Sequence, residues 1–474
     1  MKPRGSKTHQ SLDDYERVLE AAGERARRYL AEIDDRPVRE EASVEELHDL
    51  LGGDLPDAGE DPARVVDELA EAAEPGLIAL GSPRYFGFVI GGTLPAALGT
   101  DWLVTAWDQI ASLYVCGPSA AVAEDVAGRW VLDLLDLPDG AAFGLTTGGT
   151  MANFTGIASG RHAVLEREGW DVEARGLQGA PEVRVLVSEH AHATIFLALR
   201  MLGLGADKAI PLRTDEAGRI EPAALATELE RTDAPTIVCA QAGEVNTGCF
   251  DPLDRLADLC EEHGAWLHVD GAVGLWAAAS EEFSHLTEGL ERADSWSTDA
   301  HKWLNVPYDC GFIAVAEPQA LRGSMGITAP YLTAAPEARD SYQYVPESSR
   351  RGRGFVLYAA LRSLGRRGVA DLVERTSALA RLMAAELDAD PALEVINEVV
   401  INQVLVSVVG DESGDLTADA VERIQQDGTC WLAATHWRGR PAIRISVCNW
   451  RTSEEDIRRS AAAIRQAVLE ASAA

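Results

Sequence analysis

The sequence lacks several features of nucleic-acid-binding, membrane and secreted proteins. Basic residues are scarce, with 42 Lys and Arg against 76 Asp and Glu, so the formal net charge is -34. A surface of that sign repels a phosphate backbone and an anionic membrane, so we expect neither as a partner. No apolar run is long enough to span a bilayer, and the basic first residues are not followed by the apolar core of a signal peptide. We therefore expect a cytoplasmic protein.

Paired cysteines are also absent. The seven cysteines include no CxxC spacing and their number is odd, which argues against a disulfide framework and against a zinc site. Most of them stand in apolar runs, as Cys239 does in the run 236–240. We therefore expect buried, small, apolar side chains, and we predict no metal.

The chain that remains is long and has an ordinary globular composition. Its 474 residues, 46% of them hydrophobic, exceed the size at which one hydrophobic core stops growing. Residues 1–80 predict a helical N-terminal segment, in which Ser43 opens a capping box. Residues 81–352 predict a large α/β domain, and residues 353–474 predict a smaller α+β domain.

The large domain predicts a mostly parallel central sheet flanked by helices. Short apolar strands alternate with amphipathic helices, the strands at 183–187, 236–240 and 265–270 and the helices at 193–202, 222–230 and 252–263. Ligands of such sheets bind at the carboxyl ends of the strands. Asp270 and the residues before Lys302 fall at or near such ends.

Lys302 and Asp270 suggest a chemistry. Pyridoxal 5′-phosphate enzymes need a lysine amine for the Schiff base and a carboxylate that keeps the pyridine nitrogen protonated, so that the ring acts as an electron sink. A lysine at a strand end is more often a solvated charge, so the pair alone decides nothing. The prediction depends on the motifs around it.

A Gly-rich turn offers a phosphate site. Gly148, Gly149 and Thr150 follow a strand-like run and open a helix, where backbone N–H groups and a hydroxyl can bind phosphate. The turn matches neither GxGxxG nor a P-loop, and a plain tight turn is the alternative. His192 follows another strand and can lie flat on a pyridine ring. Asn246, after the strand that precedes Asp270, can donate a hydrogen bond to a cofactor.

Four motifs occur in order along the chain: Gly-Gly-Thr-Met-Ala-Asn at 148–153, Ser-Glu-His-Ala-His at 188–192, His-Val-Asp-Gly-Ala at 268–272 and Asp-Ala-His-Lys at 299–302. Their order and spacing resemble the group II pyridoxal-phosphate-dependent amino-acid decarboxylases, which include the aromatic-amino-acid, tyrosine and glutamate decarboxylases. The resemblance runs from about residue 80 to the C-terminus. It implies the fold type I, PLP-dependent transferase-like architecture, pyridoxal 5′-phosphate as cofactor, and a homodimer with its active site at the interface.

The resemblance also implies a role for individual residues of these motifs. The implied cofactor contacts are Lys302 as the Schiff-base lysine, Asp270 beside the pyridine nitrogen, His192 stacked on the ring, Gly149 and Thr150 on the phosphate, and Ala272 packed under the ring.

One position departs from the family pattern near the lysine. The aromatic-amino-acid decarboxylases have an asparagine that contacts phosphate three residues before the lysine, whereas this chain has Asp299, whose charge would repel phosphate. Ser297 or Thr298 is the candidate replacement donor, and His301 is a further candidate contact. Another departure is Glu244-Val245, where those enzymes carry a Thr-Thr pair.

The reaction is predicted from a tyrosine after the lysine. Tyr331 lies at a distance from Lys302 similar to that of the loop tyrosine that protonates Cα in the aromatic-amino-acid decarboxylases. An ordinary surface tyrosine is the alternative. Enzymes of this kind that oxidise the product to an aldehyde tend to have Phe there, so Tyr331 favours simple decarboxylation of an L-amino acid to the amine and CO2.

The substrate is left open by the sequence. The aromatic side chains of Tyr85, Phe86 and Trp107 suit an aromatic substrate, although such residues more often belong to a core. Arg444 is a candidate to hold a carboxylate or to form an ion pair. Amino transfer, aldol-type cleavage, decarboxylation-coupled aldehyde formation and a non-catalytic scaffold are the alternatives.

Overall fold

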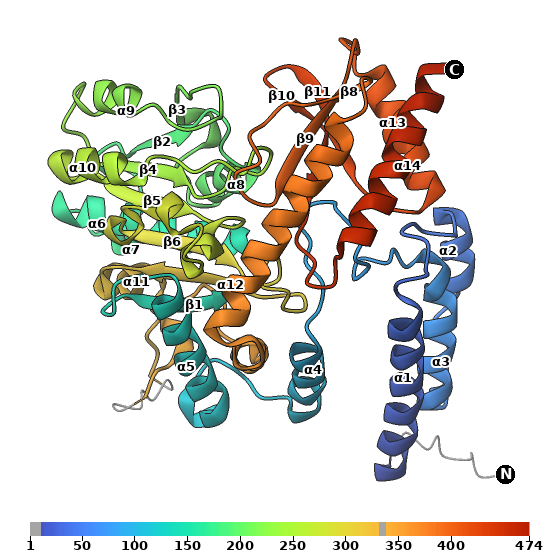
Figure 1. Cartoon of the computed structure of the whole chain (residues 1–474). Coiled ribbons are helices and arrows are strands. Elements are labelled where there is room, and N and C mark those ends of the chain that lie inside the picture. The colour runs from blue at the N-terminus through green and yellow to red at the C-terminus, as the bar shows by residue number, and fades with distance from the viewer. Residues whose placement is uncertain (1–10, 331–337, 474) are drawn as a thin grey trace.

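The computed structural model describes residues 11–330 and 338–473 (Figure 1). Two sheets organise this part of the chain. The strands are β1 (Ala142–Thr146), β2 (Arg184–Ser188), β3 (Ile210–Leu212), β4 (Thr236–Gln241), β5 (Trp266–Asp270), β6 (Ser295–Asp299), β7 (Gly311–Val315), β8 (Leu393–Val395), β9 (Gln403–Val408), β10 (Ala433–Trp437) and β11 (Arg440–Ser446).

Helices surround both sheets. They are α1 (Leu12–Glu32), α2 (Val44–Leu51), α3 (Pro62–Ala73), α4 (Pro95–Trp107), α5 (Pro118–Leu134), α6 (Gly149–Arg167), α7 (Val172–Arg175), α8 (Ala193–Met201), α9 (Pro222–Leu229), α10 (Leu253–His263), α11 (Pro318–Met325), α12 (Arg353–Asp388), α13 (Asp415–Asp427) and α14 (Glu454–Ala473). The strands and helices predicted between 183 and 270 are confirmed to within two residues at each end.

The large sheet has the order β1-β7-β6-β5-β4-β2-β3. Strands β2 to β6 pair in parallel, whereas β7 is antiparallel to both β1 and β6, so the prediction of a mostly parallel sheet is confirmed. Successive residues of one strand enter different cores: Val238 joins a cluster with α9, α10 and α12, and Ile237 joins a cluster with α6, α8 and α11. Both faces are therefore covered, which explains why these strands are apolar throughout.

Helix α6 lies unusually close to β5. Gly156 and Gly160 stand one turn apart on the helix, and a Cβ at these positions would lie 2.6 Å from the His268 ring and 2.7 Å from the Trp266 ring. Only glycine fits at this separation. The close approach places the start of α6 beside the carboxyl ends of β5 and β6.

The small sheet, in the order β10-β11-β9-β8, is antiparallel and has its own core with α13 and α14. Helix α12 connects this core to the large one. Leu357 and Leu361 belong to the large core and Leu379 and Met383 to the small one, with a break in the helical backbone at Gly365, where φ is 64°. Whether residues 81–352 and 353–474 are separate domains stays a prediction.

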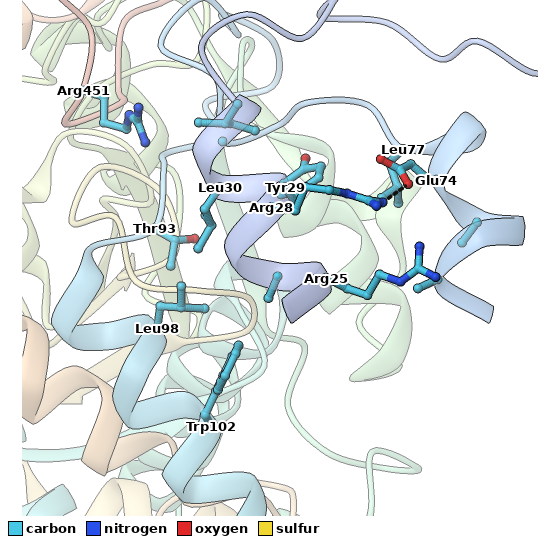
Figure 2. A pocket seen from close by; sticks show the side chains of 15 residues that line it. Arg25, Arg28, Tyr29, Leu30, Glu74, Leu77, Thr93, Leu98, Trp102 and Arg451 are labelled. Carbon is cyan, nitrogen blue, oxygen red and sulfur yellow. Dashed lines mark hydrogen bonds and ion pairs between the residues drawn. The ribbon is translucent and has the colours of Figure 1, made fainter. Parts of the chain in front are cut away.

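The N-terminal helices lie at one side of the molecule (Figure 1). The predicted capping box at Ser43 is confirmed at the start of α2. Helix α1 packs along α3, and ion pairs such as Arg17–Asp61 join the two. A cavity of about 420 Å³ lies between α1, α3 and α4, with Leu30, Leu98 and Trp102 among its lining residues (Figure 2).

Within the described residues, we find no helix with the length and apolar character that a bilayer crossing requires.

The cysteine prediction is largely confirmed. All seven cysteines are free thiols and six of them are buried, while Cys116 is exposed.

Candidate active site

The residues singled out by the motifs meet where β5 and β6 end and α6 begins. Asp270 is the last residue of β5, Asp299 is the last residue of β6, and Lys302 follows after a short turn. Gly149 opens α6, and a Cβ built on it would lie 2.8 Å from Asp299 Oδ2 and 3.6 Å from Ala272 Cβ. Ligands of parallel sheets are expected here, at the carboxyl ends of the strands.

Lys302 forms an ion pair within this group. Its Nζ lies 2.8 Å from Asp299 Oδ2, and 21% of its side chain remains exposed. Burial opposes the ammonium, but the charge and hydrogen bond of Asp299, together with Asp270, more than offset burial, so the pKa of Lys302 lies above its usual value. The lysine is therefore protonated at neutral pH in this arrangement.

Asp270 is held as a hydrogen-bond acceptor. Its Oδ2 accepts a 3.0 Å bond from Asn153 Nδ2, and its Oδ1 accepts from the Ala272 N–H at 3.1 Å. The two donors fix the orientation of the carboxyl group. Asn153 lies in the second turn of α6, within the first motif, but its spacing from Asp270 gave no sign that it binds this carboxylate.

His192 stands at the start of α8. Its Nδ1 lies 2.8 Å from Thr194 Oγ1, and the ring remains open to solvent. Partial burial lowers the pKa of His192, and the charges of Lys302 and Arg444 lower it further while Asp270 opposes them. A neutral ring next to Asp270 and Lys302 is able to cover a flat heterocycle.

The first turn of α6 has the properties of an anion site. It has no side-chain cap among the described residues, so the N–H groups of its first residues are available to a ligand. The ring of His301 faces it: a Cβ built on Gly148 would lie 3.0 Å from His301 Cε1. His301 Nδ1 accepts from the Cys310 N–H at 3.1 Å, which leaves its Nε2 as the protonated nitrogen.

An aromatic group that the sequence analysis did not single out adjoins this site. The Tyr308 ring packs on His301 with centroids 4.4 Å apart. Burial and the charge of Asp299 raise the pKa of Tyr308 to about 12. Burial also raises the pKa of Tyr85, with a smaller contribution from the Tyr308 phenol. Phe88, with 56% of its surface exposed, lies against Trp431, on which Tyr85 also stacks.

Some of the sequence-predicted residues are engaged elsewhere. Thr298 is buried and donates its hydroxyl proton to the Gly271 carbonyl at 3.0 Å, so it has no proton left for a phosphate. Ser297 likewise donates to Asn153. Both hydroxyls are engaged in these contacts, and a role of either in place of the asparagine donor stays a prediction. Phe86 is not a pocket residue either, because it is fully buried in the small core.

The roles expected for Asn246 and Tyr331 stay predictions. The Asn246 side chain bonds Glu244 and Thr435 at the end of β4, and its contact with a cofactor stays a prediction. Tyr331 lies outside the described residues, so its catalytic role stays a prediction.

Arg444, on β11, has no carboxylate within ion-pair distance among the described residues. Burial lowers the pKa of Arg444, with Glu244 opposing the shift, and its charge is one of those that act on His192. An unpaired guanidinium close to the site is available to a ligand carboxylate.

Comparison with known proteins decides the family. The conserved domain of the pyridoxal-dependent decarboxylases matches residues 45–409. The chain belongs to the pyridoxal-dependent decarboxylase family. As a member of that family, it uses pyridoxal 5′-phosphate to decarboxylate an amino acid.

The family's curated members include proteins that resemble most of the chain. An aromatic-L-amino-acid decarboxylase of Bacillus atrophaeus is 27% identical over 90% of this chain and 90% of its own length. An acidic amino acid decarboxylase of Bos taurus is 28% identical over 75% of this chain and 68% of its own length. The crystal structure of Oryza sativa TDC with PLP and tryptamine superposes with a TM-score of 0.91, at 24% identity, over 98% of this chain and 99% of that one. The last similarity shows the fold, type I, as predicted.

The residues of this pyridoxal-dependent decarboxylase fit its cofactor. The site combines an uncapped helix start, a buried carboxylate that accepts hydrogen bonds, and a lysine amine beside both. These are the three groups that a phosphate, a pyridine nitrogen and an aldehyde require. One group is unexpected: Asp299 Oδ1 is buried at the helix start without a hydrogen-bond partner among the described residues.

Proposed function

We propose that this enzyme decarboxylates an aromatic L-amino acid and that Lys302 carries the cofactor. The observation that supports an aromatic substrate is the group of rings that follows the lysine in the chain and in space, in which Tyr308 packs on His301. Flat apolar walls of this kind select flat apolar side chains. The name of the Bacillus relative supports the same substrate class.

Each residue then has a definite task. Lys302 Nζ would hold the cofactor covalently, and Asp270 would pair with its protonated pyridine nitrogen. Gly149 and Thr150 would bind the phosphate through the N–H groups at the start of α6 and through the Thr150 hydroxyl. When bound, the cofactor supplies the electron sink that stabilises the charge left on Cα as CO2 departs.

Other residues control water and protons. His192 and Ala272 would hold the cofactor ring, and His192 would exclude water from it. We assign the proton that is delivered to Cα to the hydroxyl of Tyr331, on the strength of the resemblance. Asn153 holds the Asp270 carboxylate in place through its amide N–H.

The second candidate is an acidic amino acid. Arg444 favours it, because a guanidinium that has no described partner can bind a side-chain carboxylate as well as an α-carboxylate. The Bos taurus relative, an acidic amino acid decarboxylase, supports this candidate.

The experiment is to incubate the cofactor-loaded enzyme with each standard amino acid and with DOPA, and to measure released CO2 and products by mass spectrometry. We expect amine and CO2 from aromatic substrates. Amine from aspartate or glutamate would support the second candidate, and Arg444→Met should then raise KM for these substrates by tenfold or more, an effect of about 1.4 kcal/mol or more. An aldehyde or keto acid without the amine would contradict simple decarboxylation.

The role of Lys302 has an unusually clean test. The chain contains only four lysines, Lys2, Lys7, Lys208 and Lys302. Borohydride reduction of the loaded enzyme should label the peptide that contains Lys302 alone. Lys302→Ala should abolish the label and turnover, whereas Lys208→Ala, at an exposed position, should change neither. Labelling elsewhere, or an active Lys302→Ala variant, would contradict the assignment.

We also propose that the enzyme is a cytoplasmic homodimer. Seven free thiols suit a reducing compartment. Helices α1 and α3 pack mainly on each other, and they expose Leu19, Leu30 and Leu69. Exposed apolar surface of this extent is usually covered by a partner, here a second copy of the chain.

A further inference from the structure

Asp299 stands three residues before Lys302, where its negative charge would be expected to repel a phosphate. Its side chain is 2% exposed, and it lies between the start of α6 and the Lys302 amine. Oδ2 pairs with Lys302 at 2.8 Å, while Oδ1 is buried without a hydrogen-bond partner in the described part of the chain. A buried carboxyl group with one oxygen unpaired has a site for one further hydrogen bond.

The geometry directs Asp299 toward the proposed phosphate site. Oδ2 would lie 2.8 Å from a Cβ at Gly149, and Oδ1 would lie 3.5 Å from a Cβ at Gly148. His301 Nε2 is 3.6 Å from Oδ1, too far for a good hydrogen bond. A phosphate at the first turn of α6 would therefore lie next to the Asp299 carboxylate.

Two negative groups at this separation in a buried site cannot both stay ionised at low cost. Their repulsion is relieved when one of the two takes up a proton, through which it then donates a hydrogen bond to the other. The nearest proton belongs to the Lys302 ammonium, which already donates to Asp299. Asp299 is thus both the counter-ion of the lysine and the natural acceptor of its proton.

We propose that phosphate binding at the start of α6 transfers the proton of Lys302 to Asp299 and so frees the lysine amine to form its Schiff base. The inference rests on the phosphate position given under the proposed function. The proton moves from Nζ to Oδ2, and the protonated Asp299 donates to a phosphate oxygen. The neutral amine then adds to the aldehyde carbon, a C=N bond replaces the C=O bond, and the oxygen leaves as water.

The arrangement separates the two states of the lysine. Without phosphate, Asp299 keeps Lys302 as an ammonium ion, which is protected from other aldehydes because it is not a nucleophile. With phosphate, the same carboxylate becomes the base that activates it. The other titratable groups that face this pair are His301 and Tyr308 in the turn after β6, Cys310 at the start of β7, Asp270 on β5, His192 at the start of α8 and Cys448 after β11.

The test supplies the aldehyde and the phosphate as two separate molecules, so that the effect of each can be measured. Cofactor-free enzyme is mixed with pyridoxal, which lacks phosphate, and the visible absorbance of the Schiff base is followed with and without inorganic phosphate at constant ionic strength. In the wild type, phosphate should accelerate Schiff-base formation at neutral pH by about tenfold or more. A tenfold factor corresponds to a change of one pKa unit. Phosphate should also shift the midpoint of the pH–rate profile to lower pH.

Asp299→Asn is the decisive variant, because the amide has the same shape but neither the charge nor the proton affinity. Its Schiff base should form without phosphate at a rate near that of the stimulated wild type, and phosphate should add less than about twofold. If the variant is stimulated as strongly as the wild type, phosphate acts by another route and the proposal is wrong. If the variant does not fold, the wild-type profile decides, because an unshifted midpoint contradicts the proposal.

Thr150→Val tests the phosphate position by itself. Loss of this hydroxyl should raise the phosphate concentration that gives half of the stimulation. If that concentration is unchanged while Asp299→Asn abolishes the stimulation, the proton transfer stands and the assigned phosphate ligand is wrong. If wild-type enzyme shows no stimulation at all, the transfer itself is contradicted.

Discussion

At the scale of single residues, the site depends on a chain of hydrogen bonds that ends at Asp270. Trp266 Nε1 donates to Ser295 Oγ at 2.9 Å, which lies 2.8 Å from His268 Nδ1, and His268 Nε2 lies 3.0 Å from Asn153 Oδ1. Burial lowers the pKa of His268 to about 4, so the ring is neutral at working pH. Because the Asn153 amide donates to Asp270, its oxygen must accept, and His268 must carry its proton on Nε2.

The prediction at this scale concerns Asn153. Asn153→Ala removes one donor from Asp270 and leaves the His268 N–H buried without an acceptor, which should cost about 1–3 kcal/mol of stability. The weaker hold on Asp270 should also lower kcat by about tenfold, or about 1.4 kcal/mol in the barrier. Thermal unfolding and steady-state kinetics of the loaded enzyme measure the two effects.

Ser297→Ala is the matched control, since Ser297 also bonds Asn153 but leaves the donor to Asp270 in place. It should lower stability by less and leave kcat within about twofold. If Asn153→Ala loses stability but keeps the wild-type kcat, the asparagine serves packing alone.

At the scale of elements, a buried ion cluster joins α5, β1 and the segment before α12. Glu124 is fully buried on α5, and Arg350 Nη2 donates to both of its oxygens, at 2.7 and 2.8 Å. Arg350 Nη1 also donates to the Leu145 carbonyl on β1 at 2.6 Å, and Arg339 Nη1 donates to Glu124 at 3.2 Å. The cluster gives Arg350 a structural role, which the sequence alone did not assign.

Glu124→Gln should be strongly destabilising, because it leaves Arg350 buried without a counter-ion. We expect a loss of about 3 kcal/mol or more, seen as a lower urea midpoint. Although burial opposes its charge, the two arginines hold the pKa of Glu124 below its ordinary value of 4.5, so its contribution is present above pH 4.5 and is lost as the pH falls through the folded value. Asp125→Asn, which breaks an exposed pair with Arg129 on the same helix, should cost less than about 1 kcal/mol. Equal costs for the two variants would contradict the buried-pair argument.

Local pattern predicted elements well where the signal itself is local. Apolar runs gave β2, β4 and β5, and the Gly148–Thr150 turn gave the start of α6. The direction of β7 follows from a different constraint: only residues 300–310 separate it from β6, too few for a crossover helix, so it returns antiparallel.

Partners far apart in the sequence were not predictable in this way. Phe86 is placed in the small core because its backbone N–H bonds the Trp431 carbonyl, 345 positions away. The sequence pattern around Phe86 does not indicate that contact. The same holds for Asn153 and Asp270, and for Glu124 and Arg350. The motifs therefore indicated which residues gather at the site, whereas hydrogen-bond partners such as Thr298 with Gly271 required the folded chain.

At the scale of the whole molecule, a net charge of -34 opposes both compactness and self-association. Two such chains repel each other over a distance set by the Debye length, which is about 10 Å at 0.1 M salt and about 30 Å at 0.01 M. The apolar faces of α1 and α3 have to overcome this repulsion if they form the proposed dimer. Salt should therefore favour self-association, because it screens the repulsion between the two negatively charged chains.

Sedimentation equilibrium at low and high KCl measures this balance. The wild type should shift toward the dimer as salt rises, because screening removes the repulsion while the apolar contact is retained. Leu30→Asp, at a lining residue of the cavity between α1, α3 and α4, adds a charge to the proposed interface and should weaken the dimer by tenfold or more, about 1.4 kcal/mol or more. Leu55→Asp adds the same charge at a side chain that is 93% exposed outside the helices, and it should leave association unchanged. If both variants weaken the dimer equally, net charge alone governs association and the helical face is not the interface.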